Sequence, residues 1–354
     1  MKPIRIGIIG TGNISHVHMN AYKQNPRVEL YALCDLNRER VLAAAKAYGV
    51  PEERVFTDMR EMLKLQELDA VSVCTWNSAH APCAIAALNA GKHVLCEKPM
   101  ALNAREAAEM QAAAERAGKL LMIGFVRRFG NDCFTAQDFL DTGYCGEIYY
   151  AKAVYQRRNG NPGGWFGDKS RSGGGPLIDL GVHVIDLVRF LMGNPQPVSA
   201  YGAAFHKLGN REGLKAARGY VSMEKTDHDI CDVEDSVTAL IRFDNGAVLS
   251  VETAFCLNMK GDRNGVELFG TKGGMRLEPG FELYSDANGH LTDTCLSGEP
   301  APGFEVMFQN EIDHYVACVT EGIPCRAPAE DGVTLMKILD AVYRSAETGH
   351  EVVM

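Results

Sequence analysis

Short apolar runs alternate with longer helix-forming stretches over roughly the first third of this 354-residue chain. The runs are rich in Val, Ile and Cys, as buried parallel strands require, and the stretches between them are long enough to form helices. That alternation is typical of consecutive βαβ units, which fold into a parallel sheet covered by helices. The predicted strands are Ile4–Gly10, Val28–Asp35, Ala70–Thr75, His93–Glu97 and Leu120–Phe125.

The pattern changes after Phe125. A long extended segment over 146–159 predicts a strand, and the turn sequences Asp244-Asn245-Gly246 and Thr271-Lys272-Gly273-Gly274 each lie between apolar runs, which predicts two β-hairpins. We therefore expect an α/β domain at 1–124 and, at 125–354, an α+β domain with a large, mostly antiparallel open sheet. Helices are predicted in this second part over 133–141, 177–192, 305–320 and 334–348.

Charge and cysteine usage exclude several classes of protein. The net charge is −9 and the basic pairs are confined to Arg127-Arg128 and Arg157-Arg158, so we expect no nucleic-acid partner. The N-terminal apolar stretch is too short for a signal peptide, and no window reaches the roughly 18 apolar residues of a membrane span, so we expect no membrane partner and a cytoplasmic location. The 11 cysteines are scattered without any Cys-x-x-Cys pair, which predicts reduced thiols and no metal site.

A glycine-rich turn, Gly10-Thr11-Gly12-Asn13-Ile14-Ser15, joins the first predicted strand to a helix. Its glycines let the backbone approach a pyrophosphate, which a helix N-terminus attracts. Asp35 ends the second strand 23 residues after Gly12, where a carboxylate can accept hydrogen bonds from the adenosine ribose. The alternative is a glycine-rich turn that binds no ligand. Asp35 favours a Rossmann dinucleotide-binding domain instead, and its charge favours NAD over NADP. Arg38 and Arg40 lie nearby and could bind a 2′-phosphate, so NADP remains an alternative cofactor.

The fourth predicted strand ends in Glu97-Lys98-Pro99, at the edge of the sheet where open α/β folds bind ligands. Proline restricts Lys98 to an extended conformation and so limits the directions of its side chain. A functional lysine and a solvated lysine on a surface loop both fit this position.

Six parts of the chain carry motifs of one known family: Gly10–Ile14, Asp35, Thr75–His80, Ala90–Pro99, Gly173–Asp186 and Tyr343–Gly349. Together they resemble the Gfo/Idh/MocA oxidoreductases, the family typified by inositol dehydrogenase and glucose-fructose oxidoreductase. The similarity runs nearly end to end. Two residues depart from the family pattern: Ser15 stands where the family often has glycine or alanine, and Trp76 stands where it usually has proline.

The resemblance implies an NAD-binding domain followed by a domain whose open sheet makes the oligomer contact, so we expect a homodimer or homotetramer. It also implies that Lys98, Asp179 and His183 face the nicotinamide. The residues we expect at the cofactor are Gly10, Gly12, Asn13, Ile14, Asp35, Arg40, Thr75, Trp76, Asn77, His80, Glu97 and Lys98.

Asp179 and His183 lie on a predicted helix that Pro176 begins. Because they are four residues apart they share one helix face and can serve one substrate hydroxyl. Three alternatives stay open: Asp179 complements the helix dipole, His183 packs against the sheet, or the two bind a metal for which no third ligand is evident. Asp186 either orients His183 or is a solvated helix residue.

Further substrate contacts, beside Asp179 and His183, are expected from Arg127, Tyr155, Arg157 and Trp165. Aromatic rings stack on the apolar face of a sugar, and a guanidinium hydrogen-bonds hydroxyl groups. A buried structural role fits Trp165 equally well, and one of the two adjacent arginines, Arg127 or Arg128, is expected to be solvated.

These features predict an NAD-dependent dehydrogenase that oxidises a secondary hydroxyl of a cyclitol, sugar or glycoside, or reduces the corresponding ketone. His183 would take the hydroxyl proton, Lys98 would hydrogen-bond the same oxygen, and Asp179 would orient the imidazole ring. Two alternatives are an NAD-dependent glycosidase of the same fold and a non-catalytic NAD-sensing regulator. The presence of both expected catalytic residues, Lys98 and His183, argues against a non-catalytic regulator.

Overall fold

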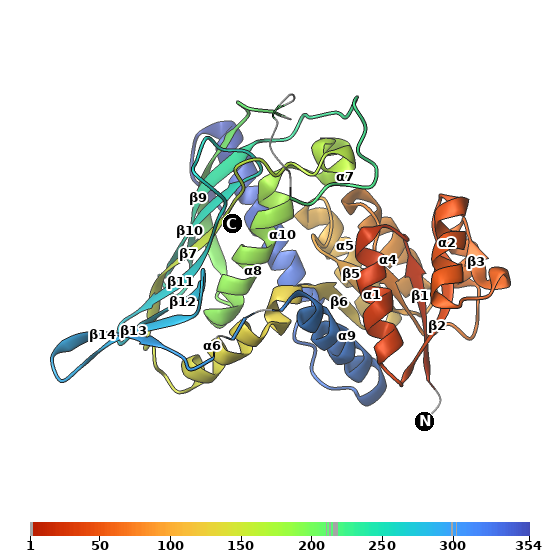
Figure 1. Ribbon diagram of the computed structural model, residues 1–354, viewed down its shortest axis with the longest axis horizontal. Coiled ribbons are helices and arrows are strands. Elements are labelled where there is room, and N and C mark those ends of the chain that lie inside the picture. The colour runs from red at the N-terminus through yellow and green to blue at the C-terminus, as the bar shows by residue number, and fades with distance from the viewer. Residues whose placement is uncertain (1–2, 210, 212–213, 215–218, 299, 302) are drawn as a thin grey trace. The chain divides into compact units, whose positions relative to one another are not determined.

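The computed structural model describes residues 3–209, 211, 214, 219–298, 300–301 and 303–354. The chain divides into two compact units, one of Met1–Val126 with Phe304–Val333 and one of Arg127–Gly303 with Thr334–Met354 (Figure 1). Each unit is thus built from two separate segments, whereas the predicted division into 1–124 and 125–354 treats each domain as continuous. Within the described ranges, no helix combines the length and apolar character needed to cross a membrane.

A six-stranded parallel sheet forms the centre of the first unit, with strand order β3-β2-β1-β4-β5-β6. This is the doubly wound order, whose topological switch point lies between β1 and β4. The five predicted strands are confirmed, and the structure adds the two-residue β3, which is too short to show a periodic pattern. The strands are β1 Ile4–Ile9, β2 Val28–Cys34, β3 Val55–Phe56, β4 Ala70–Val73, β5 His93–Glu97 and β6 Leu121–Gly124.

Two helix pairs in this unit pack against each other, α1 with α9 and α4 with α5. Helix α9 comes from the C-terminal segment: the Gln309 amide donates to the carbonyl of Ala21 at 3.3 Å, and the Asn25 amide donates to Asp313 at 2.7 Å. The helices are α1 Asn13–Gln24, α2 Arg38–Tyr48, α3 Met59–Leu63, α4 His80–Asn89, α5 Ala104–Ala117 and α9 Phe304–Glu321, with 3₁₀ turns η1 Glu52–Arg54 and η2 Asn77–Ala79.

The second unit is built on a nine-stranded sheet of order β14-β13-β12-β11-β7-β10-β9-β8-β15. Among the described strands of this sheet, β7 and β10 alone pair in parallel and the other pairings are antiparallel, which confirms the predicted fold class. Both predicted hairpins are present as β9–β10 and β11–β12. The strands are β7 Ile148–Gln156, β8 Pro197–Phe205, β9 Ser236–Phe243, β10 Val248–Ala254, β11 Arg263–Gly270, β12 Gly274–Glu278, β13 Glu282–Ala287, β14 His290–Cys295 and β15 Val352–Val353.

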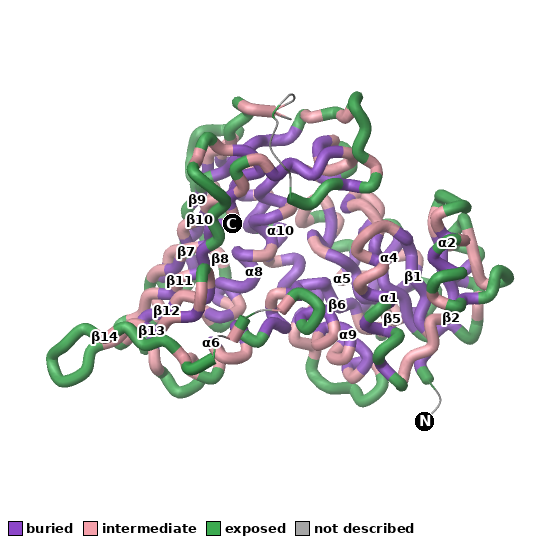
Figure 2. The backbone as a smooth tube through the Cα atoms, viewed as in Figure 1, coloured by how far each residue is buried: buried purple, intermediate pink, exposed green. Residues whose placement is uncertain are grey.

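Helices cover one face of this sheet (Figure 1). Strand β9 alternates buried and exposed residues along its second half, and α8 is buried along most of its length (Figure 2). A one-sided core of this kind gives the alternating pattern expected of an antiparallel sheet. The helical elements are η3 Val126–Phe129, α6 Asn131–Asp141, η4 Gly164–Gly167, α7 Lys169–Ser172, the π-helical η5 Leu177–Gly181, α8 Val182–Leu191 and α10 Ala329–Thr348, whose first five residues group with the first unit.

Candidate active site

The glycine-rich turn lies at the carboxyl end of β1 and is shaped for a close ligand. Gly10 has φ +90°, and a Cβ added there would lie 2.7 Å from the carbonyl oxygen of Cys74, so only glycine fits. At Gly12, by contrast, an added Cβ would meet no atom within 4 Å, which leaves open space beside the backbone. Ser15 is buried and its hydroxyl donates to the carbonyl of Gly12 at 2.6 Å, so it closes the turn as a small residue should.

Helix α1 begins directly after Gly12, which provides no side-chain cap. Its first turn contains no acidic residue. The open space beside Gly12 therefore adjoins a helix N-terminus, whose N–H groups and dipole favour an anion such as a pyrophosphate. On this observation, the turn fits NAD.

Asp35 follows β2 and is fixed beside the glycine-rich turn. Its Oδ2 accepts from the Thr11 N–H at 2.7 Å and from the Thr11 hydroxyl at 3.0 Å, and its Oδ1 accepts from the Asn37 N–H at 2.8 Å. Arg40 Nη1 lies 3.9 Å from Asp35 Oδ2. A carboxylate oxygen has two acceptor sites, so Oδ1 has capacity left for a ribose hydroxyl.

His80 is buried at the start of α4, after the turn Thr75-Trp76-Asn77. Its Nδ1 lies 2.7 Å from the carbonyl oxygen of Pro99 and its Nε2 lies 3.2 Å from that of Thr75. Burial lowers the pKa of His80, although the two carbonyl contacts oppose that shift. The ring thus joins the segments that follow β4 and β5, and this favours a structural role over the predicted contact with the cofactor.

Glu97, at the end of β5, faces the protein interior. Its Oε1 lies 2.7 Å from Nε2 of His18 on α1, a residue that the sequence analysis missed, and its Oε2 accepts from the Lys98 N–H at 3.2 Å. Burial opposes both charges, but the contact with His18 lowers the pKa of Glu97, and Cys74, followed by Glu97, raises the pKa of His18 to about 10. This buried ion pair holds the backbone immediately before Lys98.

In the second unit, Asp179 and His183 come from adjoining helical elements. Asp179 lies in the π-helical segment η5 and His183 in the first turn of α8, where the sequence predicts one continuous α-helix. From Gly174 to Arg189 every residue is buried except these two, which are partly exposed. Both polar side chains therefore belong to the accessible side of an otherwise buried helix, and π-helical segments occur often at functional sites.

The start of η5 is held by Glu234, which precedes β9. Its carboxylate accepts from the N–H groups of Gly175 at 2.9 Å and Leu177 at 3.3 Å and from the Tyr343 hydroxyl at 2.9 Å. Burial raises the pKa of Glu234, and these donors oppose that shift. No local sequence signal connects Glu234 with a segment almost 60 residues earlier, so the sequence analysis missed it.

Both arginines of the predicted Arg127-Arg128 pair are internal. Arg128 is fully buried and binds Asp186 through two bonds, Nε to Oδ2 at 2.8 Å and Nη2 to Oδ1 at 2.5 Å. The predictions that one arginine is solvated and that Asp186 could be a solvated helix residue were therefore wrong. Arg127 pairs with Asp132 at 3.0 Å and Glu278 at 2.9 Å, which favours a structural role over the predicted substrate contact.

The two aromatic candidates lie in different parts of the second unit. Tyr155 on β7 packs against the buried cluster of Leu180, Phe255 and Cys256. Its position beside Leu180 places it next to the segment that carries Asp179. Trp165 stacks on Phe166, with ring centroids 3.9 Å apart, and is partly exposed.

Two family models match this chain. One, described as the oxidoreductase family with an NAD-binding Rossmann fold, matches residues 4–125, and the other, the GFO/IDH/MocA C-terminal domain, matches residues 134–276.

Relatives of known activity match over nearly the full length. D-glucoside 3-dehydrogenase of Escherichia coli (strain K12) is 36% identical over 99% of this chain and 97% of its own, and myo-inositol 2-dehydrogenase of Thermotoga maritima is 27% identical over 97% and 96%. The crystal structure of aldose-aldose oxidoreductase from Caulobacter crescentus, complexed with glycerol, superposes with a TM-score of 0.82 at 25% identity and covers 100% of both chains. The chain therefore belongs to the Gfo/Idh/MocA family of NAD-dependent oxidoreductases.

Proposed function

We propose that this enzyme oxidises a secondary hydroxyl of a sugar, glycoside or cyclitol with NAD, or reduces the corresponding ketone. The proposal is supported by the names of its relatives, which include a D-glucoside dehydrogenase and an inositol dehydrogenase. The relative with 36% identity is named for position 3 of a D-glucoside, so D-glucosides are the first substrates to test. The observation that carries the proposal is the pair Asp179 and His183, accessible on a buried helix.

The cofactor site we propose lies at the carboxyl edge of the parallel sheet. Gly10, Gly12, Asn13 and Ile14 would hold the pyrophosphate at the start of α1, and Asp35 the adenosine ribose. Arg40, Thr75, Trp76, Asn77 and Lys98 would line the rest of the site. When bound, NAD supplies the hydride acceptor.

Two side chains act on the substrate in this proposal, and a third positions one of them. His183 accepts the proton of the substrate hydroxyl as the general base, a task suited to an imidazole at neutral pH. The Lys98 ammonium donates a hydrogen bond to the same oxygen and stabilises negative charge as it develops there. Asp179 orients the imidazole ring, and the Glu234 contacts with Gly175 and Leu177 hold the segment that carries Asp179.

A panel of D-glucosides, free sugars and cyclitols, each tested for formation of NADH, separates the candidate activities. A dehydrogenase forms NADH in proportion to the polyol consumed. A glycosidase that uses NAD transiently would release the aglycone without net NADH, and a regulator would bind NAD without either product. Absence of NADH with every member of the panel would contradict the proposal.

We predict that NAD binds at least tenfold more tightly than NADP, which corresponds to about 1.4 kcal/mol. The reason is Asp35, whose carboxylate can accept from the ribose hydroxyls of NAD but repels a 2′-phosphate. Titration calorimetry of both cofactors into the purified protein measures the ratio. Asp35→Asn removes the charge with little change of shape and should narrow the difference between the two affinities. Equal or reversed affinities in the wild type would contradict the prediction.

We predict that the uncovered face of the nine-stranded sheet pairs with a second copy of the chain, giving a homodimer or homotetramer. Apolar side chains gather there: Tyr201 and Leu240 are about half exposed and lie opposite each other on β8 and β9, and Tyr150 stacks on Phe269 at 5.3 Å. Light scattering at micromolar concentration should show an assembly, and Leu240→Glu should weaken it. A wild type of only 38.6 kDa would exclude the interface.

We also propose that the enzyme works in the cytoplasm. All eleven cysteines are unpaired thiols, as expected of a reducing compartment.

A further inference from the structure

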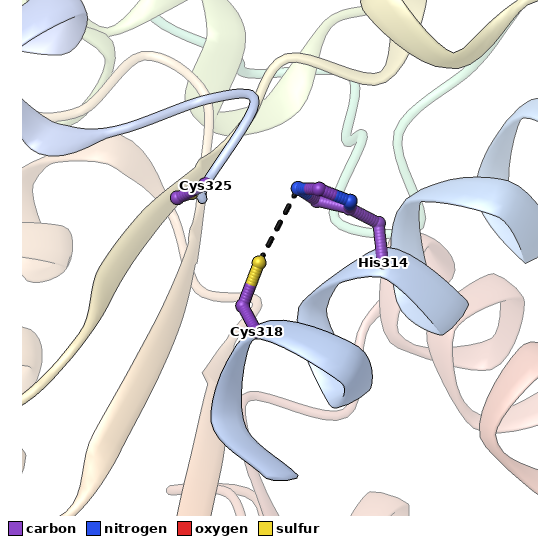
Figure 3. Close-up of side chains that lie close together, drawn as sticks. All are labelled: His314, Cys318 and Cys325. Atoms are coloured by element: carbon purple, nitrogen blue, oxygen red, sulfur yellow. Dashed lines mark hydrogen bonds between the residues drawn. The ribbon is translucent and has the colours of Figure 1, made fainter. Parts of the chain in front are cut away.

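Three potential metal ligands converge in the first unit, apart from the residues assigned to the cofactor. His314 and Cys318 are one turn apart on α9, and Cys325 faces them from the segment that follows this helix (Figure 3). Their ligand atoms all lie within 4.8 Å of one another. The spacing is His-x₃-Cys-x₆-Cys. The prediction of no metal site rested on the lack of Cys-x-x-Cys pairs, and this spacing contains none.

The separations suit a thiolate and imidazole site. With Zn–S bonds of about 2.3 Å and Zn–N bonds of about 2.0 Å, tetrahedral ligand atoms lie roughly 3.5–3.8 Å apart. Sγ of Cys318 already lies 3.3 Å from Nε2 of His314, close to the separation that such a site requires. The Arg326 N–H donates to the same Nε2 at 2.9 Å, which requires that this nitrogen carries a lone pair, as metal ligation also requires.

A second observation at this cluster points to an occupant. Glu311, one turn before His314, is fully buried, and neither of its carboxylate oxygens has a hydrogen-bond partner among the described residues. Burial raises the pKa of Glu311, and the nearby Glu97 and Cys325 raise it further. A buried carboxylate without a donor is unfavourable, and a water bound to a metal ion is a strong donor. His314 and Cys325 are partly exposed, which gives an ion a way in.

We propose that His314, Cys318 and Cys325 bind one Zn²⁺ ion, with a water molecule that donates to Glu311 as the fourth ligand. A site with two thiolates and one imidazole selects Zn²⁺ over Mg²⁺ and Ca²⁺, which prefer oxygen ligands. The ion is structural: it ties the last turns of α9 to the segment whose Ala327 carbonyl accepts from the Ile123 N–H of β6 at 3.0 Å. On binding it displaces the Arg326 N–H from Nε2 of His314.

Zinc titration of the full chain tests this site. The protein is first reduced, stripped with a chelator and exchanged into metal-free buffer, then titrated with Zn²⁺ against a chromophoric competitor. We expect one tight equivalent per chain, weakened at least about 100-fold in each of Cys318→Ser, Cys325→Ser and His314→Gln. Cys295→Ser is the matched control because Cys295 is an exposed thiol outside the cluster, and it should leave the affinity unchanged.

Two further measurements exclude nonspecific binding and misfolding. Co²⁺ in place of Zn²⁺ should give a thiolate charge-transfer band that both cluster cysteine variants lose. Zn²⁺ should raise the Tm of the wild type but not that of the variants, whose folding in the absence of metal is checked by circular dichroism. The proposal is overturned if the wild type binds Zn²⁺ no more tightly than the variants, if binding depends on Cys295, or if a Cys318–Cys325 disulfide forms and the reduced chain binds no ion.

Discussion

Replacing His183 with asparagine should lower kcat by about 10²–10⁴-fold, the contribution of a well-placed general base, while the affinity for NAD and the Tm stay close to those of the wild type. Between Gly174 and Arg189, His183 is one of two partly exposed residues in an otherwise buried stretch, so its side chain adds little to the core. Asparagine retains a polar group of similar reach but cannot accept the proton. Steady-state kinetics, calorimetric titration of NAD and thermal melting measure the three quantities on one preparation.

The same substitution at His206 is the matched control. His206 is exposed just after β8, so His206→Asn should leave both kcat and Tm unchanged. Lys98→Met gives a different expectation, because Lys98 would contact both ligands: turnover and NAD binding should fall together. If the role of His183 is only structural, the variant would have a lower Tm, and its activity would fall in proportion to the unfolded fraction. A well-folded His183→Asn enzyme with near-wild-type kcat would remove His183 from the mechanism and leave Lys98 as the base.

The parts of the fold that a local pattern encodes were predictable. Parallel strands are buried on both faces, and the apolar runs from Ile4 to Phe125 show them directly. Strands β13 and β14 were not predicted, because they form a largely exposed hairpin whose sequence does not alternate between apolar and polar residues (Figure 2). The place of α9 could not be predicted either. An apolar helix face shows that a helix packs, but not on which core, and α9 packs on α1 almost 290 residues earlier in the chain.

The candidate site divides in the same way. Gly10, Gly12 and Asp35 were recognisable because their roles follow from a turn and a strand end that are close in sequence. Glu234 was missed because its function is to accept hydrogen bonds from a distant helix start, and one acidic residue before a strand carries no such signal. The sequence led to the wrong prediction that one of the two adjacent arginines is solvated, because buried guanidinium groups are rare. Only the tertiary contacts with Asp186, Asp132 and Glu278 explain why both are internal.

The ion pair between Arg128 and Asp186 should be the most stability-sensitive polar contact of the second unit. It connects η3 to α8 three residues after His183, both partners are buried, and the guanidinium also lies 4.5 Å from the ring centroid of Phe190. Arg128→Met keeps most of the side-chain volume but leaves the Asp186 carboxylate buried without its cation. We expect a loss of about 3–5 kcal/mol in the free energy of unfolding, whereas the double variant Arg128→Met/Asp186→Leu should recover most of it.

The two tryptophans allow this loss to be assigned to one unit. Trp76 belongs to the first unit and Trp165 to the second, so urea unfolding in a Trp76→Phe background reports on the second unit through Trp165 fluorescence. Arg344→Met makes the same chemical change at an exposed position of α10 and should cost less than about 0.5 kcal/mol. If Arg128→Met costs no more than this control, the pair is not a net source of stability. If the double variant is as unstable as Arg128→Met, the loss comes from packing around the guanidinium, including its contact with Phe190, and not from the carboxylate left unpaired.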